Sequence, residues 1–137
     1  MSTATRKSTV DTVDAFFEAF GTGNQSALLD LFADKVDFTV AGSPHVPWAG
    51  SRSTKEEIAE FFGLFGQVLT PPESFAITGK VADGEDAVVF ATCVFGVLAT
   101  GKKFTNSYAL HFKVADERIV GYRMYEDSYA IHEAFTA

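Results

Sequence analysis

The chain has 137 residues, of which 47% are hydrophobic and 21% are charged, and its formal net charge is −7. This length fits a single domain over residues 1–137, and a domain of this size buries about 68% of the surface that its unfolded chain exposes. An acidic chain without a run of lysine or arginine lacks the electrostatic footprint of nucleic-acid-binding proteins, and anionic membrane surfaces would repel it. We therefore expect neither nucleic acid nor a membrane as a partner.

The first eight residues are polar and rich in serine and threonine, without the apolar stretch of a signal peptide. We expect residues 1–8 to be a flexible end and the protein to be cytoplasmic. Cys93 is the only cysteine, so no disulfide can form within the chain. A thiol inside an apolar run is typical of a small core residue.

Apolar residues recur at helical spacing from Thr9 onward and predict a first helix, which ends at the glycine-containing residues 21–24. A second helix is expected over residues 25–32. After a short turn, apolar and polar side chains alternate over residues 36–40, as they do in a strand.

A loop is expected at residues 41–50, because two prolines and two glycines there disfavour regular structure. Ser53 and Glu56 then have the spacing of a capping box, in which a serine and an acid three residues later satisfy each other's backbone donors. They predict a third helix, which Pro71 and Pro72 end.

The rest of the chain predicts a sheet. Apolar segments separated by short turns indicate consecutive strands at residues 74–82, 87–99, 102–114 and 118–126. Turns of this length join antiparallel neighbours, so we expect a meander. Asp127 then caps a last helix over residues 128–135.

The strand at residues 87–99 is apolar on both faces. One face of an antiparallel sheet usually meets water, so a second apolar face needs a cover. A second subunit is the simplest cover, and we predict a homodimer through the outer face of the sheet. His111 has the strand parity of that outer face.

The order helix, helix, strand, Pro/Trp/Gly loop, helix and four-strand meander resembles the nuclear transport factor 2-like superfamily, and within it the ketosteroid isomerase-related and SnoaL-type polyketide cyclase proteins. The resemblance spans about residues 9–135 and is carried by residues 16–24 (FFEAFGTGN), 31–38 (LFADKVDF), 47–50 (PWAG), 58–62 (IAEFF), 118–120 (RIV) and 125–127 (YED). It implies an α+β fold, in which a cone-shaped, curved antiparallel sheet wraps around the N-terminal helices and encloses one pocket.

The resemblance also implies where catalytic groups would lie, and this chain departs from that pattern. Ketosteroid isomerases use a carboxylate base and an oxyanion hole made of a tyrosine and a protonated aspartic acid. The base falls on Val40 and the protonated acid on Leu110, while the oxyanion tyrosine and its supporting tyrosine fall on Phe16 and Phe62. The acid that related hydrolases and cyclases carry on the last strand falls on Met124. These changes disfavour steroid isomerase activity, because that route needs a base and oxyanion donors.

Glu126 is the one carboxylate on the strand positions that the resemblance implies to face the pocket. Apolar neighbours should raise its pKa by desolvation, which suits a general acid or base, whereas exposure at the rim would leave it solvated. Tyr108 and Asn106 could donate hydrogen bonds to a ligand carbonyl. The alternative for Tyr108 is a core aromatic residue whose hydroxyl bonds to the backbone.

His45 and Trp48 lie on the loop that is expected to cross the pocket mouth. His45 is either a participant in proton transfer or an exposed, inert loop residue. Trp48 is expected to act as a lid that packs on Phe61 or Phe65. The three histidines and Cys93 share no metal-ligand spacing, so we expect neither a metal site nor a cofactor. The side chains expected to contact the ligand are Phe16, Phe20, Val40, Trp48, Phe61, Phe62, Phe65, Cys93, Phe95, Leu110, Tyr122 and Met124.

These observations predict a cofactor-independent enzyme of ketosteroid isomerase-like or polyketide cyclase-like type that acts on an apolar, cyclic, carbonyl-bearing molecule. Glu126 would move a proton, while Tyr108 and Asn106 would hold an oxygen. Two other functions stay open. One is a non-catalytic carrier or sensor of an apolar metabolite, and the other is a structural dimer whose pocket is filled by its own phenylalanines.

Overall fold

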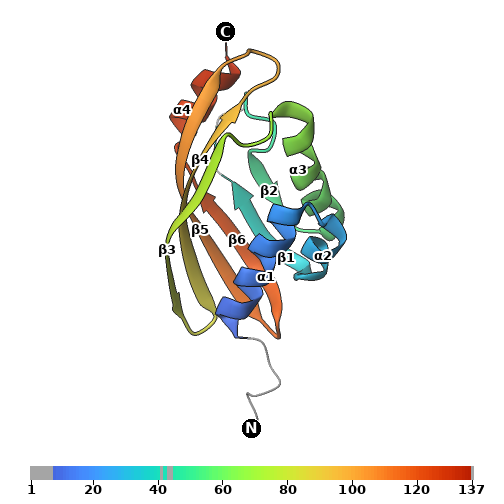
Figure 1. Cartoon of the computed structure of the whole chain (residues 1–137). Coiled ribbons are helices and arrows are strands. Elements are labelled where there is room, and N and C mark those ends of the chain that lie inside the picture. The colour runs from blue at the N-terminus through green and yellow to red at the C-terminus, as the bar shows by residue number, and fades with distance from the viewer. Residues whose placement is uncertain (1–7, 41, 43–44, 137) are drawn as a thin grey trace.

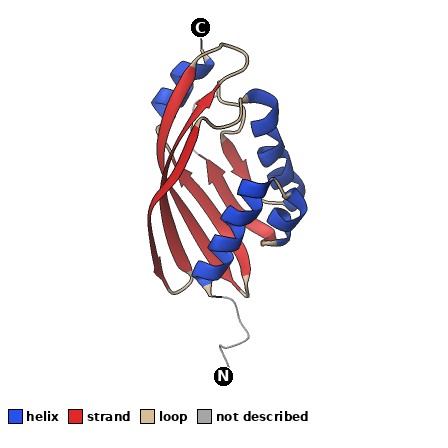
Figure 2. Ribbon diagram, viewed as in Figure 1, coloured by secondary structure: helices blue, strands red, loops and turns tan. Residues whose placement is uncertain are grey.

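The computed structural model describes residues 8–40, 42 and 45–136. Within these residues the elements are α1 (Thr9–Thr22), α2 (Gln25–Asp30), β1 (Phe32–Val40), β2 (Gly50–Arg52), α3 (Lys55–Val68), β3 (Ser74–Asp83), β4 (Asp86–Gly96), β5 (Lys103–Ala115), β6 (Arg118–Tyr125) and α4 (Ser128–Phe135). The strands form one curved, unclosed sheet, and α1 and α3 lie on the same side of it (Figure 1, Figure 2). The predicted α+β fold is confirmed.

The sheet has the strand order β2-β1-β6-β5-β4-β3. The four C-terminal strands pair antiparallel with their chain neighbours, as the short turns predict. β1 and β6 instead pair in parallel, with Val40 opposite Met124, so the sheet is not antiparallel throughout. β2 was not predicted, because a three-residue segment that pairs Arg52 with Phe38 carries no alternation to recognise.

α1 begins at Thr9, as predicted, and its N-cap is the last residue of the segment that was expected to be a flexible end. Ser8 is the N-cap of this helix, and its Oγ accepts a hydrogen bond from the Asp11 N–H at 3.0 Å within a capping box. The other residues of that segment, 1–7, lie outside the described residues. At its C-terminal end α1 is capped by Gly23 with a φ of 70°, a conformation that glycine adopts without steric cost.

The capping box of α3 lies one residue later than predicted. Thr54 Oγ1 accepts a hydrogen bond from the Glu57 N–H at 3.2 Å, and the Glu57 carboxylate accepts one from the Thr54 N–H at 3.2 Å. Ser53 is not the cap because its carbonyl accepts a hydrogen bond from the Val36 N–H at 3.0 Å, which ties it to β1. A long-range hydrogen bond thus decides which residue starts the helix.

α2 is shorter than predicted. It ends at Asp30, and Phe32 already belongs to β1, because the Leu31 carbonyl accepts a hydrogen bond from the Ile119 N–H of β6 at 2.7 Å. None of the helices in the described part of the chain is long and apolar enough to span a bilayer.

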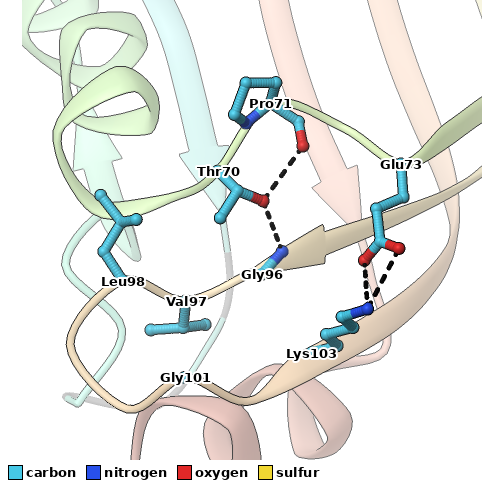
Figure 3. Close-up of a pocket in the computed structure, with 8 residues that line it drawn as sticks. All are labelled: Thr70, Pro71, Glu73, Gly96, Val97, Leu98, Gly101 and Lys103. Atoms are coloured by element: carbon cyan, nitrogen blue, oxygen red, sulfur yellow. Dashed lines mark hydrogen bonds and ion pairs between the residues drawn. The ribbon is translucent and has the colours of Figure 1, made fainter.

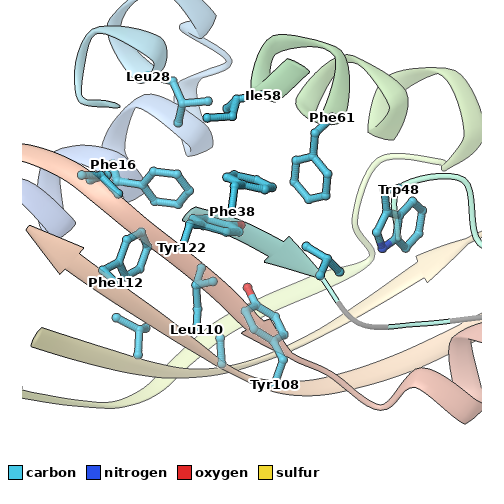
Figure 4. Close-up of a cluster of buried hydrophobic side chains, with 14 of the residues drawn as sticks. Phe16, Leu28, Phe38, Trp48, Ile58, Phe61, Tyr108, Leu110, Phe112 and Tyr122 are labelled. Atoms are coloured by element: carbon cyan, nitrogen blue, oxygen red, sulfur yellow. The ribbon is translucent and has the colours of Figure 1, made fainter. Parts of the chain in front are cut away.

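The core is a cluster of aromatic rings between the helices and the inner face of the sheet (Figure 4). Phe38 of β1 and Tyr122 of β6 stack with ring centroids 4.2 Å apart. Phe61 of α3 meets Phe38 edge-on at 4.9 Å, and Phe16 of α1 lies 5.0 Å from Phe112 of β5. These rings are at most 3% exposed, so they fix α1 and α3 against the sheet.

Candidate functional site

A cavity of about 560 Å³ lies between the inner face of the sheet and the helices α1 and α3. Small-molecule sites usually occupy about 300–1,000 Å³. Most of the predicted site residues line this cavity, namely Phe16, Phe20, Trp48, Phe65, Cys93, Phe95, Asn106, Tyr108, Leu110, Tyr122, Met124 and Glu126. The strand residues among them follow the inward alternation that the sequence implied.

The exposed part of the lining marks the mouth of the cavity. It includes Gly21 at the end of α1, Gly66 at the end of α3 and Pro72 before β3. Phe75 of β3 belongs to the same rim and is 39% exposed. Trp48, which also lines the cavity, is buried at 2% exposure.

In the described part of the loop before β2, Trp48 lines the cavity and His45 does not. Trp48 packs edge-on against Phe65 at 5.2 Å, as predicted, and also against Phe135 of α4 at 5.3 Å. His45 is exposed, and its ring lies 5.4 Å from the ring of His132, outside the cavity lining. The geometry therefore gives no support to a role of His45 in proton transfer.

Three further predicted ligand contacts lie in the core behind the cavity wall. Val40 and Phe61 are fully buried, and Phe62 packs edge-on against Phe61 at 4.9 Å. On α3 it is Phe65, one turn further along, that lines the cavity. Helical spacing could not reveal this difference, because it depends on how α3 is rotated against β1.

Some lining residues were not predicted, among them Phe17, Phe75 and Phe104. Phe104 carried a usable signal, because it shares the strand parity of Asn106; its ring faces that of Phe95 across the β4–β5 pair at 6.1 Å. Phe75 lies opposite Cys93 in a register that no local pattern fixes.

Glu126, directly after β6, is the only carboxylic acid among the described residues that line the cavity. Its Oε2 accepts a hydrogen bond from Trp48 Nε1 at 3.3 Å, and its Oε1 accepts one from Asn106 Nδ2 at 3.2 Å. Asn106 Oδ1 in turn accepts a hydrogen bond from the Asp127 N–H at 3.1 Å. Both ends of the Asn106 amide therefore have protein partners, whereas among the described residues no side-chain partner of the Tyr108 hydroxyl competes with a ligand in the same way.

Burial sets the protonation states in the cavity. It raises the pKa of Glu126 above the ordinary value, while the hydrogen bonds from Trp48 and Asn106 oppose that rise. Burial also raises the pKa of Tyr108 and the pKa of Tyr122, and burial with the nearby Glu126 raises the pKa of Cys93 to about 11. The phenols and the thiol therefore keep their protons at neutral pH and can act as hydrogen-bond donors.

The cavity also lacks positive charge. None of the described lining residues is lysine, arginine or histidine. In the same described part of the chain, no group of three or more His, Cys, Asp or Glu side chains could hold a metal ion. The cavity is thus apolar, with one acid and several neutral donors at its inner end.

A second cavity, of about 420 Å³, lies beside the β4–β5 hairpin (Figure 3). Thr70 and Pro71 line both cavities. Thr70 Oγ1 accepts a hydrogen bond from the Gly96 N–H at 3.0 Å, and Lys103 Nζ lies 3.1 Å from a carboxylate oxygen of Glu73. These contacts hold the segment after α3 against the end of β4 and the start of β5, between the two cavities.

Solved structures share this fold along nearly the whole chain. A nuclear transport factor 2-like protein from Burkholderia thailandensis is 18% identical, with a TM-score of 0.86 over 96% of this chain and 99% of that chain. A Catenulispora acidiphila protein with a ketosteroid isomerase-like fold, in complex with trimethylamine, is 17% identical, with a TM-score of 0.74 over 90% and 91% of the two chains. TerC, co-crystallised with polyporic acid, is 19% identical, with a TM-score of 0.79 over 94% and 98%. The fold is therefore of the nuclear transport factor 2-like class.

Within this class the family can be stated. The family described as SnoaL-like domain matches residues 13–122, and the chain belongs to it, as its resemblance to SnoaL-type proteins predicted. No curated protein sequence matches the chain.

Proposed function

We propose that this protein is an enzyme of the ketosteroid isomerase-like or polyketide cyclase-like type, which moves a proton on an apolar, cyclic carbonyl compound without a cofactor. The observation that carries the proposal is the setting of Glu126. It is the only acid among the described lining residues, burial raises its pKa, and two donors hold its carboxyl group. A raised carboxyl pKa lies closer to the operating pH, where general acid–base catalysis is most effective.

The rest of the lining supplies binding energy and a partner for the ligand oxygen. Burial of apolar ligand surface contributes about 25 cal/mol per Å², and a fixed orientation lowers the barrier to proton transfer. Tyr108 and Tyr122 line the cavity and keep their protons at neutral pH. In this proposal one of these hydroxyls donates to the ligand carbonyl, where negative charge develops as Glu126 takes the proton.

Family membership and two structural neighbours support a small-molecule site. TerC was co-crystallised with polyporic acid, and the Catenulispora acidiphila protein was solved in complex with trimethylamine. These ligands are those of the neighbours. They support the use of this fold to enclose small molecules, and the chemistry proposed here rests on the residues of this chain.

A non-catalytic carrier or sensor of an apolar metabolite is the alternative function. It is favoured by the apolar residues Val40, Phe16, Leu110 and Phe62, which stand where ketosteroid isomerase-like enzymes carry polar catalytic groups. The cavity of about 560 Å³ argues against the third possibility, a structural dimer with a self-filled cone, because such a cone would leave no ligand-sized space.

The test is turnover of a panel of steroid enones and aromatic polyketides by the wild type, Glu126→Gln and Glu133→Gln. Glu133 is exposed on α4 and serves as the matched control. For any compound that is converted, we expect Glu126→Gln to lower kcat by about 100-fold or more, the usual contribution of a general acid or base. Unchanged turnover by Glu126→Gln would overturn the assignment, and saturable binding without product would favour the carrier.

We further propose that a second copy of the chain covers the outer face of the sheet. On this face Val81 of β3 and Phe90 of β4 are 58% and 42% exposed, and Val88 lies opposite Val81. His111 of β5, predicted to face outward, contacts Asp86 at 2.8 Å beside these apolar residues. A two-fold axis would place the apolar patch against its own copy, so the surface is complementary to itself.

A further inference from the structure

The orientation of the Asn106 amide is fixed by the backbone. The Asp127 N–H can only donate, and it lies 3.1 Å from Asn106 Oδ1. The amide oxygen must therefore face Asp127, and Nδ2 must face Glu126, where it lies 3.2 Å from Oε1. Because Asp127 is the N-cap of α4, the start of this helix decides which end of the amide Glu126 meets.

Trp48 meets the other carboxyl oxygen with a group that also can only donate. The indole N–H has no acceptor function, and Nε1 lies 3.3 Å from Glu126 Oε2. The indole ring is 2% exposed and lies edge-on to Phe65 and Phe135 at 5.2 and 5.3 Å. It cannot turn away from Glu126 without breaking this packing.

Both protein partners of the Glu126 carboxyl group therefore donate hydrogen bonds, and neither accepts one. A protonated Glu126 cannot pass its proton to Trp48 or to Asn106. Each carboxyl oxygen thus accepts from one of these donors, and the same carboxyl group belongs to the lining of the cavity.

We infer that Trp48 and Asn106 are positioning residues, which direct the exchangeable proton of Glu126 into the ligand cavity. The Asn106 amide is itself held in place by the backbone N–H of Asp127, the N-cap of α4. The inference rests on the proposed function of Glu126 as the proton carrier. In this inference Trp48 and Asn106 act by holding Glu126. The sequence had instead suggested a lid for Trp48 and a direct ligand contact for Asn106.

The test uses the one tryptophan of the chain. Its indole N–H gives a single signal in a proton–nitrogen NMR spectrum, and this signal reports the charge of Glu126 without any substrate. We expect the signal to titrate in the wild type and to lose that transition in Glu126→Gln. A wild-type transition that persists in Glu126→Gln would show that the indole does not sense this carboxyl group and would overturn the inference.

Asn106→Asp replaces the donor amide by a second carboxyl group of the same shape, which also adds a negative charge beside Glu126. The new carboxyl group still accepts from the Asp127 N–H but presents an acceptor to Glu126, so the midpoint of the indole titration should move to higher pH. Asn24→Asp is the matched control, because Asn24 also accepts a backbone hydrogen bond, from the Ala27 N–H at 3.1 Å, at the N-cap of α2. This exchange should leave the midpoint where it is.

Trp48→Phe is the second arm and keeps an aromatic ring while removing the other donor. Its effect is measured on the carboxyl carbon signal of Glu126, which is assigned by its absence in Glu126→Gln. The midpoint should again move to higher pH. Unmoved midpoints in both folded variants would overturn the positioning role, whereas a failure of the proposed catalysis would appear separately, as unchanged turnover by Glu126→Gln.

Discussion

The indole nitrogen of Trp48 lies 3.3 Å from Oε2 of Glu126, although 78 positions separate the two residues in the chain. This contact joins the loop before β2 to the end of β6 in the lining of an aromatic cavity. It places a donor on an acid whose pKa is raised by burial. The chemistry proposed for this protein depends on that acid, and the following predictions test its setting and its surroundings.

The pH dependence of stability should change when Glu126 is replaced. Its pKa in the folded protein is raised above the ordinary value of 4.5, so the folded state favours the protonated acid. The stability from this group is present below 4.5 and is lost as the pH rises through the folded pKa. We therefore expect the free energy of unfolding of the wild type, minus that of Glu126→Gln, to fall over this range. Urea unfolding across the range measures it, and a difference that rises with pH would contradict the account.

A carboxylate at position 40 should destabilise the protein. Val40 is fully buried in the core behind the cavity, so Val40→Asp leaves a buried charge without a partner. Such a charge costs about 3–5 kcal/mol. Thr39→Asp is the control, because Thr39 lies on the opposite face of β1, opposite Arg123 of β6, and should cost less than about 1 kcal/mol. Equal unfolding midpoints for Val40→Asp and the wild type in urea would refute the placement of Val40.

The cavity should select neutral ligands. None of the described residues that line it is basic, and its one acid is Glu126. A ligand carboxylate would lose its hydration without gaining a cation, so it should bind at least about tenfold more weakly than the neutral ketone of the same skeleton, a difference of about 1.4 kcal/mol. Isothermal titration of such a matched pair measures the ratio. Equal or tighter binding of the carboxylate would count against the assignment.

Phe90→Glu should dissociate the proposed homodimer. Phe90 is 42% exposed on the outer face of β4, and a charge there would be desolvated twice in a symmetric interface. Leu98→Glu is the control, because Leu98 is 57% exposed but lies in the β4–β5 hairpin, beyond the end of β4. Sedimentation equilibrium distinguishes monomer from dimer. A wild type that is monomeric at micromolar concentration, or a Phe90→Glu variant that stays dimeric, would contradict the proposal.

Much of the fold follows from patterns that are local in the chain. The four-strand meander and the cap of α4 by Asp127 depend on alternation, turn length and one side-chain hydrogen bond, and all are confirmed. β2 and the start of α3 were missed or displaced. Both are fixed by hydrogen bonds between segments, such as the one from the Val36 N–H to the Ser53 carbonyl.

In the site, too, local patterns predict some features, while contacts between distant segments decide the others. Strand alternation brings Cys93, Tyr108 and Glu126 to one cavity, as expected from their parity. The partner of each polar group could not be predicted, because it depends on how separate elements pack. The packing of Trp48 on Phe65 was predicted, but its contacts with Phe135 of α4 and with Glu126 were not. Asn106 connects Asp127 to Glu126, because its oxygen accepts a hydrogen bond from the Asp127 N–H beyond the end of β6 while its nitrogen donates to Glu126.

The most direct test of the central claim, that the cavity beside Trp48 and Glu126 binds an apolar carbonyl compound, is a fluorescence titration of Trp48 with the panel of steroid enones and aromatic polyketides. Cys93→Phe fills the cavity, and Ser107→Phe adds the same ring on the exposed outer face of β5 as a control. We predict a saturable change with at least one compound in the wild type and in Ser107→Phe, and no change in Cys93→Phe. The absence of any saturable response in the folded wild type, or an undiminished response in Cys93→Phe, would contradict the claim.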